Sequence, residues 1–254
     1  MLEERGPIAV VRLARPEKRN ALDLEAWRLM GAHLARACGR RGPGRVVALA
    51  GSGGFFSAGD DIRAMLSLET PGEARGFFEA LAGAVWSLLT CGKPTMAVLE
   101  GPAVGGGAEI VLAVDYSIAS RRAWLSYPEA HLALIPPILS TLGFLLLGRR
   151  AWRLAATGAT LTAEEAARLG IVDEVVEPGE EWARAAAVAE RLASLPYGVA
   201  AAVRRASLRL ALNALEAAVD DLSSLVLDAE AKSRMRAFLE GFRWVSKPGL
   251  GDNK

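Results

Sequence analysis

The feature of this sequence that most constrains its fold is the stretch of residues 94–115, PTMAVLEGPAVGGGAEIVLAVD. Thr95 to Leu99 is a short apolar run, which predicts a buried strand. Four glycines and a proline between Gly101 and Gly107 predict a tight turn in which backbone comes close to a neighbouring group. Ala108 to Val114 is apolar with one charge and predicts the first turns of a buried helix. The stretch therefore predicts a strand, a turn and a helix in direct succession.

This turn has a chemical consequence. A helix that begins on consecutive glycines leaves its first N–H groups unpaired and unshielded, and the positive end of the helix dipole lies behind them. Such a helix end suits a negative oxygen. Glu109 lies three residues after Gly106, so its side chain leans back over the same helix end. Two interpretations stay open from these residues alone: an oxyanion site beside a carboxylate, or a glycine-rich turn with a partly buried Glu.

Composition narrows the class of protein. The formal net charge of the 254 residues is +1 and the arginines are spread along the chain, which argues against nucleic acid as the main partner. Two histidines, far apart, give no indication of a metal site. Cys38 and Cys91 fit no C-x-x-C pattern, so we expect two reduced thiols in a cytoplasmic protein.

No targeting or membrane segment is predicted. The N-terminus begins with charged residues and a strand-like run, unlike a signal peptide. The most apolar window, Leu132 to Leu147, is short for a membrane span and is interrupted by Pro136 and Pro137. We therefore expect it to form buried core or the wall of a pocket, and we expect no membrane partner.

Strands and helices alternate up to about residue 178, which indicates an α/β fold with mostly parallel pairing. Expected strands cover 8–13, 45–50, 95–99, 116–119 and 172–176, and expected helices before residue 180 cover 24–38, 62–66, 73–89, 150–156 and a segment ending near 170. From Trp182 the pattern is helical to about Arg243, broken by Pro196 and Gly198. We divide the chain into a core of residues 1–195 and a helical C-terminal lobe of residues 196–254, which packs on a neighbouring subunit or on its own core.

The other glycine-rich loop, GSGGFFSAGDD at residues 51–61, fits none of the commoner motifs. Phe56 stands where a dinucleotide fingerprint needs its third glycine, and Phe55 stands where a nucleophile elbow around Ser57 needs one. The loop could instead present the N–H of Asp60. Together with the N–H of Gly106, it would form an oxyanion hole for a thioester carbonyl.

Five segments, in order and in register, resemble the crotonase, or enoyl-CoA hydratase/isomerase, superfamily. They are RPEKRNALD, GSGGFFSAGDDI, GPAVGGGAEIVLAVDYSIAS, LSYPEAHLALIP and ATGATLTAEEAARLGIVDEVV. Leu125 and Ala133 depart from the family pattern. The resemblance implies an α/β fold with a spiral core of repeated ββα units and a C-terminal helical lobe, assembled as a homotrimer or hexamer.

The resemblance also assigns the catalytic groups. The N–H groups of Asp60 and Gly106 would hold the thioester oxygen and stabilise an enolate. Glu109 and Glu129 match the two catalytic glutamates of hydratases, one to deprotonate water and the other to protonate the α-carbon. Without the resemblance, Glu129 would more naturally be an acidic residue at a helix start. Two acids that face one water must titrate as a coupled pair, and partial burial should raise at least one pKa.

Contacts with coenzyme A follow from the same loops. The resemblance implies that backbone of Ala58, Asp60 and Ile62 holds adenine and pantetheine, and that Lys18 or Arg19 lies beside the phosphates, although a solvated basic turn fits those two equally. Coenzyme A is part of the substrate, and no metal or redox cofactor is expected.

Three departures from the family are visible. Asp60 replaces a small or apolar residue, and we expect its side chain to point to solvent or to an Arg, because a charge facing the substrate would oppose an enolate. Ile138, Leu139 and Leu142 are apolar where many hydratases have a glycine-rich segment, which indicates either an apolar acyl pocket or a core helix. The basic pair that the family has near its C-terminus is displaced here, to Arg243 and Lys247.

The expected activity is hydration of 2-enoyl-CoA thioesters to 3-hydroxyacyl-CoA. The first alternative is enoyl-CoA isomerisation or another acyl-CoA reaction of the superfamily. An alternative of a different class is a non-catalytic acyl-CoA-binding subunit. RNA binding is disfavoured by the absence of a concentrated basic patch.

Overall fold

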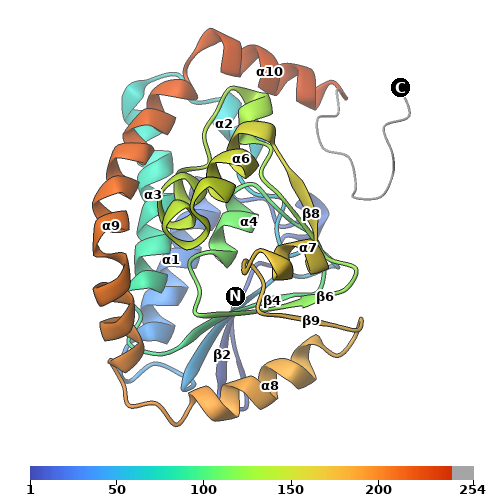
Figure 1. Ribbon diagram of the computed structural model, residues 1–254. Coiled ribbons are helices and arrows are strands. Elements are labelled where there is room, and N and C mark those ends of the chain that lie inside the picture. The colour runs from blue at the N-terminus through green and yellow to red at the C-terminus, as the bar shows by residue number, and fades with distance from the viewer. Residues whose placement is uncertain (242–254) are drawn as a thin grey trace.

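The computed structural model describes residues 1–241, without the side chains of residues 208–212, and this part of the chain forms two sheets flanked by helices (Figure 1). The larger sheet has the strand order β1-β2-β3-β4-β6-β9 and the smaller one β5-β7-β8. In the larger sheet only the β1–β2 pair is antiparallel. The mostly parallel α/β class expected from the sequence is confirmed.

The bounds of the elements are as follows. The strands are β1 (Leu2–Arg5), β2 (Ile8–Arg12), β3 (Val46–Ala50), β4 (Thr95–Leu99), β5 (Ala103–Val104), β6 (Tyr116–Ser120), β7 (Trp124–Ser126), β8 (Thr160–Thr162) and β9 (Glu174–Val176). The helices are α1 (Leu24–Cys38), α2 (Ile62–Leu66), α3 (Pro71–Leu89), α4 (Gly106–Val111), α5 (Phe144–Leu147), α6 (Arg149–Thr157), α7 (Ala163–Arg168), α8 (Glu181–Leu192), α9 (Val199–Leu225) and α10 (Ala229–Leu239). Two 3₁₀ turns, η1 (Pro16–Lys18) and η2 (Glu129–Leu132), and a π-helical turn, η3 (Leu139–Gly143), complete the described part.

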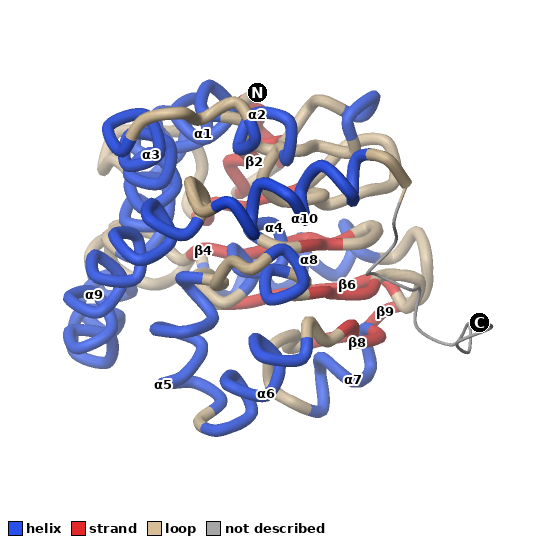
Figure 2. The backbone as a smooth tube through the Cα atoms, turned by 90° about the horizontal axis from the view of Figure 1, so that it is seen from above, coloured by secondary structure: helices blue, strands red, loops and turns tan. Residues whose placement is uncertain are grey.

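Both faces of the larger sheet are buried, because its central strands are apolar at every position. Successive side chains of a strand point to opposite faces. Val46 and Ala48 of β3 pack with α8, whereas Val47 and Leu49 join the larger core that includes α1 and α3. Figure 1 shows α8 on one side of the sheet and α1 and α3 on the other, and Figure 2 shows α9 along the outer side of α3. Continuous apolar runs are typical of parallel strands covered on both faces.

Local signals placed most helices correctly. The Asp23 carboxylate caps α1 by accepting a hydrogen bond from the N–H of Ala26 at 2.9 Å. Thr162 and Glu165 form the expected capping box at the start of α7. The sequence analysis missed β1, because its residues LEER show no clear alternation of apolar and polar side chains and none of them is fully buried. It also missed the break at residues 226–228, where Asp228 caps α10.

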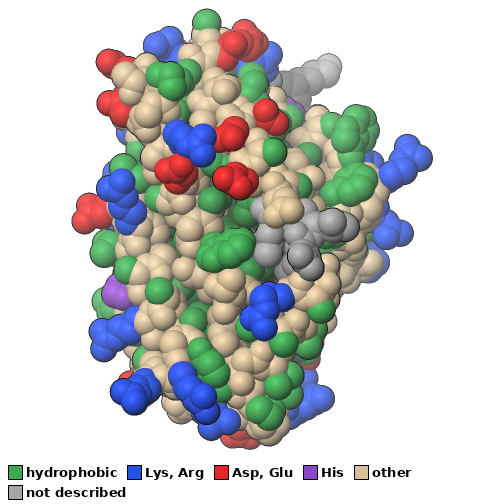
Figure 3. All heavy atoms as spheres, turned by 90° about the vertical axis from the view of Figure 1, so that its left-hand side faces the viewer, with side chains coloured by type: hydrophobic (Ala, Val, Ile, Leu, Met, Phe, Trp, Pro, Cys, Tyr) green, Lys and Arg blue, Asp and Glu red, His purple; other side chains and the backbone are tan. Residues whose placement is uncertain are grey.

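The C-terminal helices pack back onto the rest of the described chain. α9 lies along α3 and against η3, and α10 lies against α2 and η2. Figure 3 shows the face on which α9 lies, with hydrophobic side chains dispersed among acidic and basic ones. The division at residue 196 remains a prediction. Arg243 and Lys247 lie outside the described residues.

The expectation of two reduced thiols is wrong. Cys38 ends α1 and Cys91 follows α3, and the two form a disulfide with their Cα atoms 4.8 Å apart. They are 53 residues apart in the sequence, but α1 packs along α3 and brings both helix ends together. No helix within residues 1–241 is long and apolar enough to cross a membrane.

Candidate active site

Four segments that are far apart in sequence lie side by side and form the floor of the site. Leu22 bridges Asp60, with hydrogen bonds from Leu22 N–H to Gly59 O (2.8 Å) and from Asp61 N–H to Leu22 O (2.9 Å). Ser57 bridges Ala103 in the same parallel sense. β5 then pairs in parallel with β7. Each of the four segments therefore lies directly beside the one that precedes it in the chain.

Glycines allow these loops to touch. Gly59 has φ +78°, and a Cβ added there would lie 2.5 Å from the carbonyl oxygen of Val104 and 3.1 Å from the nitrogen of Gly106. Gly105 has φ +54°, and a Cβ there would lie 3.0 Å from Glu129 Oε1. Any other residue at either position would be strained and would push the two loops apart. The glycine-rich turn predicted from sequence is thus a point of close approach.

These loops surround one cavity of about 1080 Å³. Glu109 and Glu129 both line it, and so does Asp60. An apolar part of its wall is built from Met65, Phe78, Leu132, Leu134, Ile135, Leu222, Phe238 and Leu239. The cavity therefore combines carboxyl groups with a surface suited to a hydrocarbon chain.

The two predicted oxyanion donors are available. Gly106 is the first residue of α4, so its N–H has no partner inside the helix. Among the described residues, the N–H of Gly106 donates no hydrogen bond, and the N–H of Asp60 donates to no other residue, only toward its own carboxyl. The contact between Gly59 and Gly106 brings the two backbone segments together. Two unused donors beside a cavity are what an oxyanion requires.

Glu109 lies in the first turn of α4 and is 1% exposed. Its Oε1 accepts hydrogen bonds from the N–H groups of Ile138 (2.7 Å) and Leu139 (2.8 Å) at the start of η3. Burial, and then the charge of Glu129, raise the pKa of Glu109 well above its ordinary value, and the two N–H donors act in the opposite direction. The donors fix the carboxyl and favour its ionised form.

Glu129 is the first residue of η2, directly after Pro128. Its Oε2 is fully buried and has no hydrogen-bond partner among the described residues, and the same holds for the hydroxyl of Tyr127. Burial raises the pKa of Glu129 to about 8, and the charge of Asp60 adds to the rise. A buried carboxyl with one unpartnered oxygen is more stable protonated, so the surroundings of Glu129 favour its neutral form.

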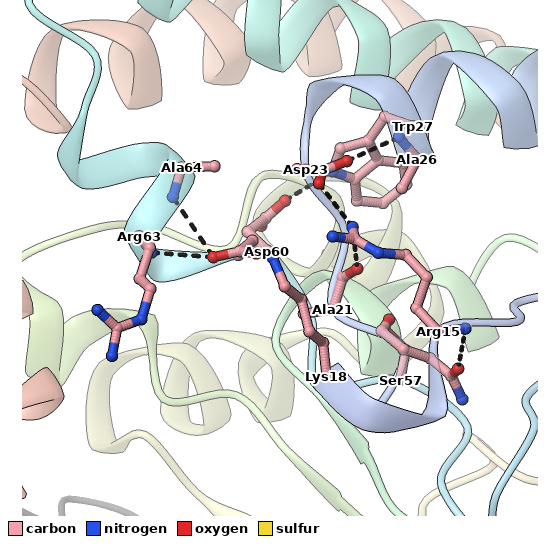
Figure 4. Close-up of polar contacts among 12 residues, drawn as sticks. Arg15, Lys18, Ala21, Asp23, Ala26, Trp27, Ser57, Asp60, Arg63 and Ala64 are labelled. Atoms are coloured by element: carbon pink, nitrogen blue, oxygen red, sulfur yellow. Dashed lines mark hydrogen bonds and ion pairs between the residues drawn. The ribbon is translucent and has the colours of Figure 1, made fainter.

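The side chain of Asp60 is half-buried and lines the cavity, and it pairs with no Arg among the described residues. Its Oδ1 instead accepts a hydrogen bond of 2.7 Å from the indole N–H of Trp27 on α1 (Figure 4). Its Oδ2 lies 3.2 Å from the point where a Cβ on Gly106 would be. Burial raises the pKa of Asp60 to about 6, against the effect of the Trp27 hydrogen bond. The basic partner that we expected is bonded to the next residue instead, as Lys18 Nζ lies 3.2 Å from Asp61 Oδ2.

All residues predicted to contact coenzyme A line the cavity: Lys18, Arg19, Ala58, Asp60 and Ile62. The sequence analysis missed three further cations on its wall, Arg63, Arg121 and Arg122. Arg121 is paired with Glu164 at 2.6 Å and with Glu177 at 2.8 Å. Arg63 lies on α2, whereas Arg121 and Arg122 lie in the turn between β6 and β7. None of them belongs to a family motif, so only the fold reveals that the two segments converge.

Residues 138–142 belong to the core. Ile138, Leu139 and Leu142 are at most 3% exposed and do not line the cavity. Of the two interpretations left open for this segment, the core helix is correct, and its backbone rather than its side chains serves the site. Among residues 1–241, no group of His, Cys, Asp and Glu is arranged to hold a metal ion.

Lys232 links α10 by hydrogen bonds to the end of α2, beside the cavity. Its Nζ donates to the carbonyl oxygens of Met65 (3.2 Å), Leu66 (2.9 Å) and Leu68 (2.5 Å) at the end of α2. Lys232→Met would leave these carbonyls without that donor, and we expect a loss of about 1–3 kcal/mol in the free energy of unfolding. Because α10 supplies Phe238 to the cavity wall, the KM for an acyl-CoA should rise as well.

Lys93 provides a matched control that does not line the cavity. Lys93 Nζ donates to three carbonyl oxygens after α1, those of Ala37, Gly42 and Pro43. Lys93→Met should lower stability in urea unfolding by a similar amount without a change in KM. An equal rise of KM in both variants would contradict the role given to Lys232.

Comparisons with known proteins agree with this architecture. Residues 3–246 match the family model described as enoyl-CoA hydratase/isomerase. A provisionally named enoyl-CoA hydratase of Thermus thermophilus is 34% identical over 196 residues, covering 75% of this chain and 76% of that protein. A carnitinyl-CoA dehydratase of Salmonella typhi is 35% identical over 207 residues, covering 79% and 77%. The crystal structure of an enoyl-CoA hydratase from Mycobacterium avium subsp. paratuberculosis has a TM-score of 0.83 at 25% identity and covers 93% of this chain and 97% of that one.

Proposed function

The chain belongs to the enoyl-CoA hydratase/isomerase family, and on that premise we propose that it adds water across the double bond of 2-enoyl-CoA thioesters. The observation that carries this proposal is the presence of two carboxyls, Glu109 and Glu129, on the wall of one cavity beside two unused N–H donors. An enolate isomerisation needs only one proton-transferring carboxyl, whereas addition of water is served by two.

The thioester carbonyl would bind to the N–H groups of Asp60 and Gly106. As water adds to the β-carbon, negative charge moves onto the carbonyl oxygen and an enolate forms. Fixed donors that are already oriented stabilise this charge without reorganisation, and the positive end of α4 acts in the same sense. The apolar wall, which includes Phe78 and Phe238, would hold the acyl chain.

The different surroundings of the two carboxyls suggest a division of labour. Glu109 receives two N–H donors, which stabilise its ionised form, so it would take a proton from water. Glu129 has an unpartnered oxygen and a pKa raised to about 8 by burial, so it would supply the proton to the α-carbon. Each proton lost by water to Glu109 is balanced by one that Glu129 gives, and solvent exchange restores both groups.

A direct assay tests the proposal. Crotonyl-CoA absorbs in the ultraviolet through its conjugated double bond, and the band disappears only if water adds. We expect the purified chain to bleach this band and to form 3-hydroxybutyryl-CoA, identified by mass. A chain that moves the double bond of a 3-enoyl-CoA but leaves crotonyl-CoA unchanged would be an isomerase. A chain that binds both thioesters and changes neither would be a non-catalytic subunit.

The same site would run in reverse, since hydration and dehydration share one transition state. A relative of 35% identity is named a dehydratase. We therefore expect the chain to restore the ultraviolet band when it is given a 3-hydroxyacyl-CoA. The ratio of kcat/KM for hydration to kcat/KM for dehydration must equal the equilibrium constant of the reaction.

The active form is proposed to be a homotrimer or a hexamer. α5 and α6 expose several large apolar side chains to solvent in the single chain, namely Phe144, Leu145, Leu146 and Trp152. Contiguous apolar side chains on a surface mark sites of association. Light scattering should give three or six times the 26.9 kDa of one chain, and a monomer at micromolar concentration would contradict the proposal.

A further inference from the structure

We propose that Asp60 works as a neutral carboxyl and supplies a third hydrogen-bond donor to the thioester oxygen, with Trp27 deciding which of its oxygens carries the proton. The inference rests on the proposed function, because it assumes an oxyanion at the N–H groups of Asp60 and Gly106. It adds a side chain to a site that would otherwise use backbone alone.

The geometry selects one oxygen of Asp60 as the donor. An indole N–H can only donate, so Oδ1, at 2.7 Å from Trp27 Nε1, must accept. In the neutral carboxyl the proton is therefore on Oδ2. This oxygen faces Gly106, 3.2 Å from where a Cβ would lie, and has no hydrogen-bond partner among the described residues. The Oδ2–H group is thus free to donate to an oxygen bound at Gly106.

Burial, with no cation of the described residues paired to it, favours the neutral form of Asp60. Glu109 approaches from α4 and Glu129 from η2, and the charge of Asp60 contributes to the raised pKa of each. The remaining neighbours are Trp27 on α1, the pair Lys18–Asp61 between η1 and α2, and the pair Arg15–Asp23 before α1 (Figure 4). Both cations are already paired with another carboxylate, and burial raises the pKa of Asp60 to about 6.

An ionised Asp60 would oppose catalysis. A negative charge beside the two oxyanion donors raises the energy of the enolate, whereas a neutral carboxyl stabilises it, as protonated carboxyls in apolar oxyanion sites do. The charge would also raise the pKa of Glu109 and so reduce the fraction of it that is ionised and able to accept a proton. Ionisation of Asp60 should therefore lower the rate as pH rises, at pH values below those at which Glu129 loses its proton.

Asp60→Asn is a close mimic of the neutral state. Its amide oxygen can accept from Trp27, and its NH₂ group then occupies the place of Oδ2–H. We expect kcat/KM for crotonyl-CoA to fall about tenfold per pH unit in the wild-type chain above the pKa of Asp60. Asp60→Asn should stay flat over the same range, match the wild type within about threefold at pH 5.5 and exceed it by roughly 10–100-fold at pH 8.

Further variants separate the donor from the charge. Asp60→Ala also lacks the charge but has no donor, so it should be at least about tenfold slower than Asp60→Asn. Trp27→Phe removes a hydrogen bond that favours the ionised carboxylate, so the loss of activity should move to higher pH. Glu181→Gln removes a buried carboxyl that does not line the cavity and should keep the wild-type pH dependence. Equal activity of Asp60→Ala and Asp60→Asn, or a wild-type slope in Asp60→Asn, would overturn the proposal.

A binding measurement keeps this test independent of hydration. A 3-ketoacyl-CoA forms an enolate with its own ultraviolet band, and its affinity can be titrated at each pH. The wild-type chain should bind the enolate less tightly as Asp60 ionises, and Asp60→Asn should not. If the chain shows this pattern of binding but does not hydrate crotonyl-CoA, only the proposed function is rejected. Binding in which both chains respond equally to pH would reject the role of Asp60.

Discussion

Glu109→Gln is expected to reduce kcat for crotonyl-CoA hydration by roughly 10²–10⁴-fold, the range that a positioned general base contributes. Gln keeps the size of the side chain, and its carbonyl oxygen can still accept from the N–H groups of Ile138 and Leu139. It cannot take a proton from water. The KM should change little, because the bound thioester is held by other groups. Steady-state kinetics at several pH values measure both constants.

Two controls separate chemistry from folding. Glu181 on α8 is a carboxyl of equal burial, 1% exposed, away from the cavity, and Glu181→Gln should leave kcat unchanged. Glu109→Gln should also be no less stable than the wild type at pH 8. A carboxyl whose pKa is raised on folding destabilises the fold increasingly as pH rises above its unfolded pKa, and Gln removes this penalty. A variant that loses activity only in proportion to lost stability would contradict the catalytic role.

The partner carboxyl should respond to pH in the opposite direction. Glu129 is protonated up to about pH 8, so its role as an acid is lost above that value. In the proposed mechanism Glu109 and Glu129 act together in one addition of water, so the double Gln variant should be little slower than the slower single variant. Losses that multiply would mean that the two groups act in separate steps.

The parts of the site that lie within one short stretch of residues could be predicted from the sequence. The strand–turn–helix around Gly105 and Glu109 follows from apolar runs and glycines within one short stretch, and the resemblance supplied Glu129 from a second. Long-range pairing could not be derived, because β5 and β7 are three residues or fewer and carry no periodic pattern. Only the parallel bridges between loops reveal that these segments adjoin.

The orientation of Asp60 was missed for a related reason. Its partner Trp27 lies 33 positions earlier, and an amphipathic helix such as α1 gives no sign of the acceptor to which the N–H of its buried Trp donates. We argued that a charge should avoid an enolate and therefore point outward. The structure resolves the same conflict differently, since burial raises the pKa of this carboxyl to about 6.

Removing the Cys38–Cys91 disulfide is expected to lower the free energy of unfolding by about 4 kcal/mol, the chain-entropy effect of a loop of 53 residues. Both residues are buried, at 7% and 1% exposed, so the bridge should resist reductant until the chain unfolds. Thiol titration in denaturant should therefore detect no free thiol unless reductant is added first. Urea unfolding of Cys38→Ala, Cys91→Ala and the double variant would measure the loss.

The double variant is the decisive comparison. Either single substitution already breaks the bridge, so the second should cost far less than the first, and the two losses should not add. Arg204 provides a control at the same junction: it donates to the carbonyl oxygens of Leu89 and Cys91 and pairs with Asp115. Arg204→Met should destabilise the wild-type chain and the double Cys variant alike, because its contacts do not require the bridge. Two free thiols in the purified chain, with additive losses, would show instead that Cys38 and Cys91 act as separate buried residues.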